Sequence, residues 1–230
     1  MIKRQIVLDT ETTGLEPKDG HRVIEIGCVE MINRRITGKT FHRYINPERL
    51  IETEAAAVHG ITNDFLKDKP VFGDIVDEFI RFIDGAELII HNAPFDTGFI
   101  NHEFALLKRG VGRIQDSCTI FDTLPLARKL HPGQRNNLDA LCKRYGVDNK
   151  HREWHGGLLD AELLAWTYLA MTSGQDSLFG MNEEENAFAK EQFLNTASAF
   201  VQPRKPLKIL RATPEEVFAH QAYLDKIRKA

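Results

Sequence analysis

Residues 6–11 have the sequence Ile-Val-Leu-Asp-Thr-Glu, in which three apolar residues run directly into two carboxylates. A short apolar run bounded by polar residues predicts a buried strand. Because strand side chains alternate with a period of two, Asp9 and Glu11 project from the same face at the strand end. Adjacent carboxylates repel each other unless a cation or a donor neutralises them, and oxygen pairs of this kind suit Mg²⁺ or Mn²⁺. An isolated Asp-x-Glu is more often a solvated strand end, so this pair needs support from elsewhere in the chain.

The pattern downstream of this strand predicts an α/β fold. Two further strands rich in β-branched and aromatic residues, 23–29 and 40–45, are separated by a turn at 33–35, which indicates hairpins. Apolar residues then follow the i, i+3, i+4, i+7 spacing of an amphipathic helix over 72–83. The remaining expected elements are strands at 88–90 and 118–121 and helices at 94–108, 123–129, 138–145 and 158–172. Hairpins followed by strand–helix units predict a mixed sheet flanked by helices.

Composition excludes several classes of protein. The 230 residues are 42% hydrophobic and 27% charged, which suits a globular domain. The three cysteines, Cys28, Cys118 and Cys142, are odd in number and form no C-x-x-C pair, which argues against a disulfide framework and a structural zinc site. No apolar run reaches the roughly 18–20 residues of a membrane span, and the first residues do not resemble a secretory signal. We therefore expect a soluble cytoplasmic protein.

Charge is distributed unevenly along the chain. The net charge of −3 argues against binding nucleic acid by bulk electrostatics alone. Residues 1–180 carry −4, residues 181–202 carry −3 and residues 203–230 carry +4. Together with the Ser-Gly-Gln-Asp-Ser stretch that begins at Ser173, this predicts a compact domain at 1–173, a linker at 174–202 and a separate C-terminal segment at 203–230.

Two more polar blocks lie at predicted element ends. Asn92-Ala93-Pro94-Phe95-Asp96 follows the strand at 88–90, with Asn92 as the expected N-cap and Asp96 in the first helical turn. His155-Gly156-Gly157-Leu158-Leu159-Asp160 comes later, and the glycine pair is expected to leave His155 on a loop while Asp160 begins a helix. Each block alone is compatible with an ordinary helix start or a surface histidine. His151 is the alternative histidine nearby.

In this order and spacing, these blocks and Val58-His59-Gly60-Ile61-Thr62 resemble the DEDDh 3′–5′ exonuclease family over roughly residues 5–173. The resemblance implies a ribonuclease-H-like fold with a mixed five-stranded sheet, and phosphodiester hydrolysis with two Mg²⁺ or Mn²⁺ ions. It implies that Asp9, Glu11, Asp96 and Asp160 hold the metals and that His155 is the general base, since the ordinary pKa of histidine lies near neutrality. It also suggests substrate contacts by Thr12, Thr13 and Leu15. His59, His91 and Phe95 are weaker candidates, and a plain core position is the alternative for Phe95.

The tail contains two candidate interaction segments. Gln175-Asp176-Ser177-Leu178-Phe179 resembles a peptide by which replication proteins dock on the sliding clamp, with Gln175 making polar contacts and Leu178 and Phe179 filling an apolar pocket. The alternative is a plain linker folded back on the domain. The family resemblance implies that residues 203–230 bind the catalytic subunit of a polymerase. The alternative is that their apolar stripe packs on their own domain. A small accessory subunit is a further possible partner.

The leading functional hypothesis is therefore the removal of mispaired deoxynucleotides from a single-stranded or frayed DNA 3′ end beside a replicative polymerase. An RNA-trimming member of the same family is one alternative, against which residues 174–230 argue. A structural bridge between polymerase and clamp is another, against which the intact set of five catalytic positions argues.

Overall fold

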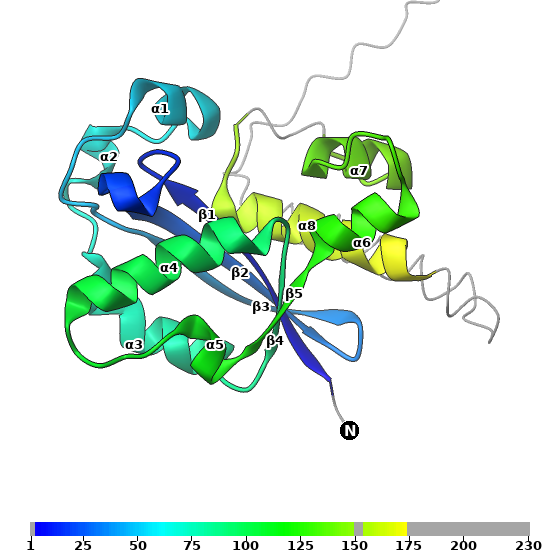
Figure 1. Cartoon of the computed structure of the whole chain (residues 1–230), viewed down its shortest axis with the longest axis horizontal. Coiled ribbons are helices and arrows are strands. Elements are labelled where there is room, and N and C mark those ends of the chain that lie inside the picture. Colours follow the sequence, from blue (N-terminus) through cyan, green and yellow to red (C-terminus); the bar gives the residue numbers. More distant parts are fainter. Residues whose placement is uncertain (1–2, 150–153, 174–230) are drawn as a thin grey trace, which may run out of the picture. The chain divides into compact units, whose positions relative to one another are not determined.

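The computed structural model describes residues 3–149 and 154–173, and Figure 1 shows their arrangement. The predicted clamp-binding peptide, the linker and the C-terminal segment lie outside the described residues, as does His151. The elements in chain order are β1 (Arg4–Thr12), the 3-10 helix η1 (Pro17–Asp19), β2 (Val23–Ile32), β3 (Arg35–Tyr44), α1 (Thr53–His59), α2 (Asn63–Leu66), α3 (Phe72–Ile83), β4 (Glu87–Ile90), α4 (Ala93–Leu107), α5 (Ile114–Ser117), β5 (Thr119–Asp122), α6 (Thr123–Leu130), α7 (Leu138–Tyr145) and α8 (Gly157–Ser173).

The five strands form one mixed sheet in the order β3-β2-β1-β4-β5. Strands β1, β2 and β3 pair antiparallel, whereas β4 is parallel to both β1 and β5. This confirms the expected α/β fold of hairpins followed by strand–helix units. Strand β1 lies at the centre of the sheet, and the residues at its end, Asp9 and Glu11, pair with β2.

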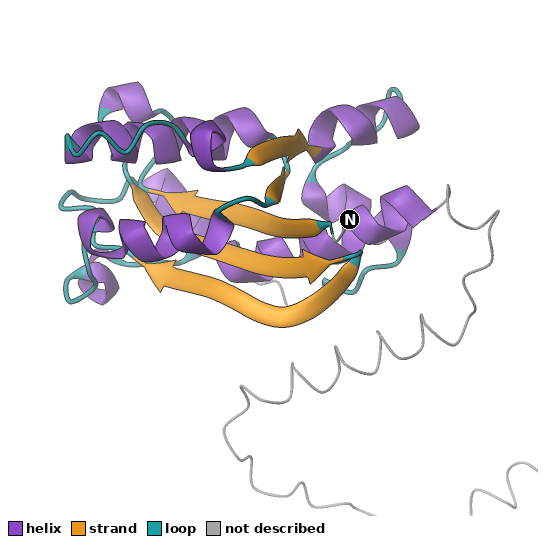
Figure 2. Ribbon diagram, turned by 90° about the horizontal axis from the view of Figure 1, so that it is seen from below, coloured by secondary structure: helices purple, strands orange, loops and turns teal. Residues whose placement is uncertain are grey.

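Helices cover both faces of the sheet (Figure 2). The side chains of Ile6 and Leu8 belong to the apolar cluster that includes α3 and α4, while Val7 belongs to the cluster formed with α8. This alternation is the period-two pattern of a strand buried on both faces. By the same alternation, the side chains of Asp9 and Glu11 lie on the same face of β1 as Val7, which is the face that α8 covers.

The structure extends and corrects the predicted elements. Strand β3 begins at Arg35, five residues before the expected start, because Asn33 and Arg34 both have positive φ angles of 49° and 66°. A two-residue turn of this kind lets pairing continue to the base of the hairpin, where Ile32 lies opposite Arg35. The sequence pattern does not predict η1, α1, α2 or α5, each of which has seven residues or fewer and lacks a clear apolar stripe.

Two further sequence expectations can be compared with the structure. All three cysteines are free and buried. The sequence likewise argues against a disulfide framework. Among the residues that the structure describes, no helix has the length and apolar character needed to cross a bilayer.

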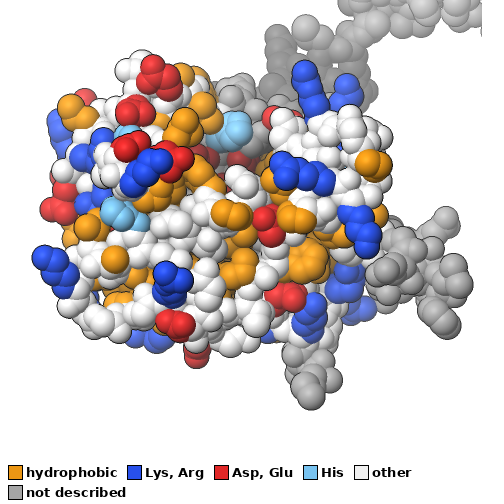
Figure 3. All heavy atoms as spheres, viewed as in Figure 1, with side chains coloured by type: hydrophobic (Ala, Val, Ile, Leu, Met, Phe, Trp, Pro, Cys, Tyr) orange, Lys and Arg blue, Asp and Glu red, His pale blue; other side chains and the backbone are white. Residues whose placement is uncertain are grey.

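Charge is also uneven within the folded domain. Residues 123–145, which form α6, α7 and their connection, contain five Lys or Arg and one Asp, a balance of +4. Residues 1–122 contain 15 Lys or Arg and 20 Asp or Glu, a balance of −5. On the face shown in Figure 3, blue Lys and Arg side chains gather over α6 and α7, while red acidic side chains gather near α1. We call residues 123–145 the basic hairpin.

Candidate active site

The N-terminus of α8 reaches the end of β1 because two glycines meet there. Gly27 of β2 pairs with Asp9 in the sheet register, and a Cβ atom added to Gly27 would lie 2.1 Å from the backbone of Gly157. A Cβ on Gly157 would in turn lie 3.2 Å from the carbonyl oxygen of Asp9. Glycine is needed where two backbones approach this closely. This contact sets the first turn of α8, and therefore Asp160, against the end of β1.

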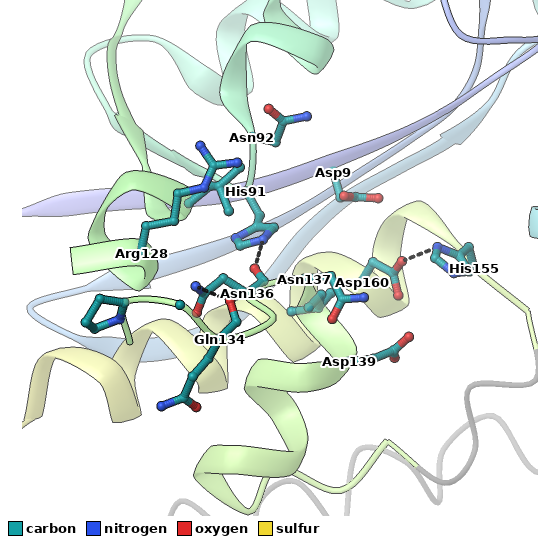
Figure 4. A pocket seen from close by; sticks show the side chains of 14 residues that line it. Asp9, His91, Asn92, Arg128, Gln134, Asn136, Asn137, Asp139, His155 and Asp160 are labelled. Atoms are coloured by element: carbon teal, nitrogen blue, oxygen red, sulfur yellow. Dashed lines mark hydrogen bonds and ion pairs between the residues drawn. The ribbon is translucent and has the colours of Figure 1, made fainter. Parts of the chain in front are cut away.

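The acidic side chains converge at this contact. One ligand atom each from Glu11, His155 and Asp160 lies within 4.8 Å of the others, and Asp9 lines the same pocket as Asp160 (Figure 4). Glu11 and Asp160 are 9% and 3% exposed. Buried carboxylates in one cluster are costly without positive charge, and their hard oxygen donors match Mg²⁺ or Mn²⁺. The donor set therefore fits a divalent-cation centre, with Asp9 and Asp160 brought together as the sequence predicts.

His155 lies on the loop before α8, as the glycine pair predicts, and contacts the acidic cluster. Its Nδ1 atom is 3.4 Å from Asp160 Oδ2, and its side chain is 44% exposed. The backbone N–H of His155 donates a hydrogen bond to the carbonyl of Val58 at 3.1 Å, and the Trp154 ring packs over Gly60. The Val58–Thr62 block of the sequence therefore supports the histidine loop. The role of His155 as general base stays a prediction.

Asp96 approaches β1 from α4. Its Oδ1 atom accepts hydrogen bonds from the Thr10 backbone N–H at 3.0 Å and from the Thr10 hydroxyl at 2.7 Å. Thr10 lies between Asp9 and Glu11 in the chain. Burial raises the pKa of Asp96 to about 7. It is therefore near the predicted metal residues, although it is not among the residues that line the pocket. Asn92 occupies the N-cap position, but its side chain makes no capping bond because its backbone adopts φ +69°, which corrects the predicted cap.

The residues after the Asp9–Glu11 pair divide into two groups. Leu15 is 77% exposed and available to a ligand. The Thr12 hydroxyl donates to the carbonyl of Gly14 at 2.6 Å. Thr13 is fully buried, and its hydroxyl accepts a hydrogen bond from the Arg22 N–H and contacts His21. The Thr13 hydroxyl therefore closes the turn between β1 and β2, and substrate contact by Thr13 stays a prediction.

The weaker substrate candidates lie in different surroundings. His59 lines a separate cavity of about 360 Å³, and burial lowers its pKa. Phe95 packs against the core beside Phe99, at 5.0 Å between ring centroids. His91 lines the main pocket, where its ring bridges the Thr123 hydroxyl and the carbonyl of Asn136, each at 2.8 Å. Burial is the main reason that the pKa of His91 is lowered.

One whole wall of the pocket was not predicted from the sequence. The pocket has a volume of about 960 Å³ and extends from Asp9, His155 and Asp160 to Arg128 of α6 and the loop before α7. Figure 4 shows Arg128 and the side chains of this loop on one side, and His155 on the other. The Arg135-Asn136-Asn137 sequence gives a weak polar signal, but only the packing of α6 and α7 brings it to the carboxylates.

Comparison with known proteins gives close relatives over the full chain. Two proteins named DNA polymerase III subunit epsilon, from Salmonella typhimurium strain LT2 and Escherichia coli strain K12, are 52% and 51% identical to this chain over 233 residues. Each match covers 99% of this chain and 95% of the relative. The relative from Buchnera aphidicola, with the same name, is 49% identical over 231 residues and covers 99% of this chain and 98% of its own.

Solved structures share the fold. Exonuclease X in complex with 5′ overhanging duplex DNA superimposes with a TM-score of 0.58 at 24% identity, covering 80% of this chain and 98% of the other. Escherichia coli exonuclease I in complex with a dT13 oligonucleotide gives a TM-score of 0.64 at 18% identity, covering 77% and 42%. The sequence profile of the exonuclease family matches residues 6–168. This chain therefore belongs to the exonuclease family, together with the epsilon subunits of DNA polymerase III.

Proposed function

We propose that this chain is the proofreading 3′–5′ exonuclease subunit of a replicative DNA polymerase, which removes mispaired deoxynucleotides from a primer end. The observation that carries the proposal is the meeting of Glu11 with Asp160 and His155, from two widely separated parts of the sequence, within 4.8 Å of one another. The near full-length similarity to DNA polymerase III epsilon subunits supports the same function. We expect it to act in the cytoplasm, where replication takes place in bacteria.

Asp9, Glu11 and Asp160 would hold two divalent cations, Mg²⁺ or Mn²⁺, with Asp96 completing the set. When bound, the cations neutralise the carboxylates before an anionic substrate arrives and lower the pKa of a coordinated water. The burial of Glu11 and Asp160 supports this assignment, because carboxylates removed from bulk water gain the most from a cation.

His155 would accept the proton of the attacking water. The water oxygen attacks phosphorus, the bond from phosphorus to the 3′ oxygen of the penultimate nucleotide breaks, and that oxygen takes up a proton. A partly exposed ring that contacts Asp160 is suited to this role, since it reaches the acidic cluster and can pass its proton to solvent. The hydrogen bond from its backbone to Val58 holds the loop in place.

Selectivity for mispaired ends would come from fraying of the primer terminus. A mismatched terminal nucleotide unstacks more readily than a paired one, so it enters a single-strand pocket more often. Leu15, exposed just beyond the acidic pair, is suited to contact the terminal base, and Thr12 would flank it.

The test is digestion of a DNA primer with a 3′ mismatch, beside a matched primer and an RNA strand of the same sequence. We expect Mg²⁺-dependent release of 5′-mononucleotides from the 3′ end, faster from the mismatched primer. Preference for short RNA would instead identify an RNA-trimming enzyme. No cleavage of any strand would leave a structural bridge between polymerase and clamp.

Residues 203–230 would bind the polymerase catalytic subunit, and Gln175, Leu178 and Phe179 would bind the sliding clamp. The near full-length match to relatives named as polymerase subunits supports the first assignment, and the local sequence supports the second. Deletion of 203–230 should abolish co-purification with the polymerase subunit while nuclease activity remains. Replacement of Leu178 and Phe179 by Ala should weaken clamp binding; an unchanged clamp affinity would make 175–179 a plain linker.

A further inference from the structure

The wall of the pocket opposite His155 contains a positively charged side chain, Arg128, that the proposed chemistry does not use. Arg128 lies in the last turn of α6 and lines the same pocket as Asp9 and Asp160. Figure 4 shows the two aspartates lying between Arg128 and His155. A strand that places its scissile phosphate at the aspartates would therefore have further phosphates within reach of one wall or the other.

Arg128 is not held by a carboxylate of the described part of the chain. Other arginines of the domain form ion pairs, such as Arg22 with Glu103 at 2.8 Å and Arg43 with Glu78 at 2.6 Å. Among the described residues, no Asp or Glu forms a salt bridge with Arg128. A guanidinium stays charged at all relevant pH values and presents donors that match phosphate oxygens.

The loop beside Arg128 is already ordered for binding. The Asn136 amide donates to the carbonyls of His131 at 3.2 Å and Gln134 at 3.0 Å, and the carbonyl of Asn136 contacts the His91 ring. Arg144 donates to the carbonyl of Arg135 at 2.9 Å. These bonds fix the wall before a ligand arrives, so less conformational entropy is lost on binding.

The electrostatics of this wall also favour an anionic strand. The basic hairpin carries +4, whereas residues 1–122 carry −5. The one acidic residue of the hairpin, Asp139, also lines the pocket and accepts a hydrogen bond from Asn149 at 3.2 Å, so the positive balance comes from the hairpin as a whole. A polyanion that approaches an acidic domain is directed to its positive part, and each phosphate contact there releases bound counterions.

We propose that Arg128 binds the phosphodiester on the 5′ side of the scissile bond, so that this wall of the pocket holds the strand that remains after cleavage. The loop after β1, which carries Leu15, lies beside α1 and across the end of β1 from α6 and α7 (Figure 1). If the terminal nucleotide occupies the side of Leu15, the retained strand occupies the side of Arg128. The inference rests on the proposed exonuclease function, which it deepens by naming a residue that positions the substrate.

The test uses chain length to separate the phosphates. The dinucleotide d(TpT) contains only the scissile phosphodiester, whereas the trinucleotide d(TpTpT) has one more on its 5′ side. In the wild-type protein we expect kcat/KM for removal of the 3′-terminal nucleotide to be higher for the trinucleotide. In Arg128→Gln the ratio of trinucleotide to dinucleotide kcat/KM should fall about tenfold, as expected for loss of one charge-assisted contact. The loss should appear mainly as a higher KM.

Lys129→Gln is the matched control, since it removes the same charge from the next residue, which does not line the pocket. It should leave the length ratio near the wild-type value, and Arg128→Lys should restore part of it. For a longer oligonucleotide, Arg128→Gln should reduce the slope of log kcat/KM against log salt by about 0.7, the value for one phosphate on a single strand.

Three outcomes would overturn the inference. The first is an unchanged length ratio in Arg128→Gln, which together with an equal loss on both oligonucleotides would place Arg128 at the scissile phosphate. The second is an equal fall of the ratio in Lys129→Gln, and the third is a lowered melting temperature in Arg128→Gln that accounts for its lost activity. Failure of the proposed function is distinguishable, because the wild-type protein would then release no nucleotide from either substrate.

Discussion

Asp160 and His155 are five residues apart but occupy opposite environments. The Asp160 side chain is 4% exposed in the first turn of a helix that is seated on the sheet by the Gly27–Gly157 contact. The His155 side chain is 44% exposed on a loop that is held by one backbone hydrogen bond to Val58 and by the packing of Trp154 over Gly60. The two side chains nevertheless contact each other.

The difference fits the two chemical tasks that we propose for these residues. Groups that hold cations gain from burial and fixed geometry, because both strengthen the interaction between opposite charges. A group that takes a proton from water and releases it to solvent needs access to both. The comparison therefore predicts that substitutions of the buried carboxylates abolish activity. Substitutions in the loop should reduce turnover to a degree that depends on how directly they affect His155.

The largest effect is expected for Asp160→Asn, which removes a carboxylate from the acidic cluster and the acidic partner of His155. We expect turnover to fall by about 10⁴-fold or more, since metal-ion stabilisation and proton transfer are both impaired. Mg²⁺ or Mn²⁺ binding, measured by calorimetry, should weaken in parallel. Circular dichroism should show an intact fold, and retained turnover would refute the assignment of Asp160 as a metal ligand.

His155→Ala should reduce turnover by about 10³-fold, within the range for loss of a general base. Cation affinity should stay near the wild-type value. A large loss of cation affinity would instead make His155 a ligand, which its place within 4.8 Å of Glu11 and Asp160 allows. His151→Ala is the control, and an equal loss of turnover there would overturn the choice of histidine.

Gly27→Ala tests the seating of α8. The added methyl would meet the Gly157 backbone at 2.1 Å, so α8 must shift, and we expect an activity loss of about 10²-fold because a displacement near 1 Å has that effect on positioned groups. Unfolding should be easier by about 1–3 kcal/mol. Gly156→Ala has open space around its methyl and should change neither quantity much. Equal behaviour of the two variants would contradict the role of the glycine contact.

Asp96 should make the stability of the metal-free protein pH-dependent. Burial raises the pKa of Asp96 to about 7, above its ordinary value of 3.8, so the folded state binds more protons than the unfolded state between these values. The stability that protonated Asp96 contributes is therefore fully present below pH 3.8 and is lost as the pH rises through about 7. Between pH 5 and pH 8, the free energy of unfolding of the metal-free wild-type protein, measured in urea, should fall by on the order of 2 kcal/mol more than that of Asp96→Asn. An unchanged pH dependence would contradict the raised pKa.

The smallest effect is expected for Trp154→Ala, at the edge of the histidine loop. The side chain is 54% exposed, and its ring contacts Gly60 rather than the acidic cluster. Loss of this contact should loosen the loop and lower turnover about threefold to tenfold, since a shift in His155 affects positioning without removing the base. Trp154→Phe should preserve most of the activity. A loss as large as that of His155→Ala would show that the ring itself contacts the substrate.

Much of the fold follows from local patterns in the sequence. The run at 6–8 predicts the central strand, the helical spacing over 72–83 predicts α3, and the Gly156-Gly157 pair predicts that His155 precedes a helix while Asp160 starts one. These signals are strong because each element carries its own periodicity or its own breaker residues. Helices α1 and α2 have no such signal, since a short helix that packs along one side needs few apolar positions.

The site was only partly predictable, because local patterns do not report contacts between distant segments. The Asp-x-Glu spacing places two carboxylates on one face of a strand, and the family resemblance supplies the other candidates. The buried position of Thr13, the bond from Asp96 to Thr10 and the placement of His59 in a separate cavity depend on contacts between distant segments. The Arg128 wall was missed because a lone arginine in the last turn of a helix has no distinctive spacing.

The sequence by itself therefore determined the mixed α/β fold, the acidic pair on β1 and the loop position of His155, because alternation and helix breaking act over a few residues. Only the tertiary structure decided which of the other candidates meet that pair. The Gly27–Gly157 contact joins segments 130 residues apart. It exists because two backbone segments can approach closely where neither residue carries a Cβ atom. The packing of α6 and α7 likewise decides that Arg128, rather than another cation, faces the carboxylates.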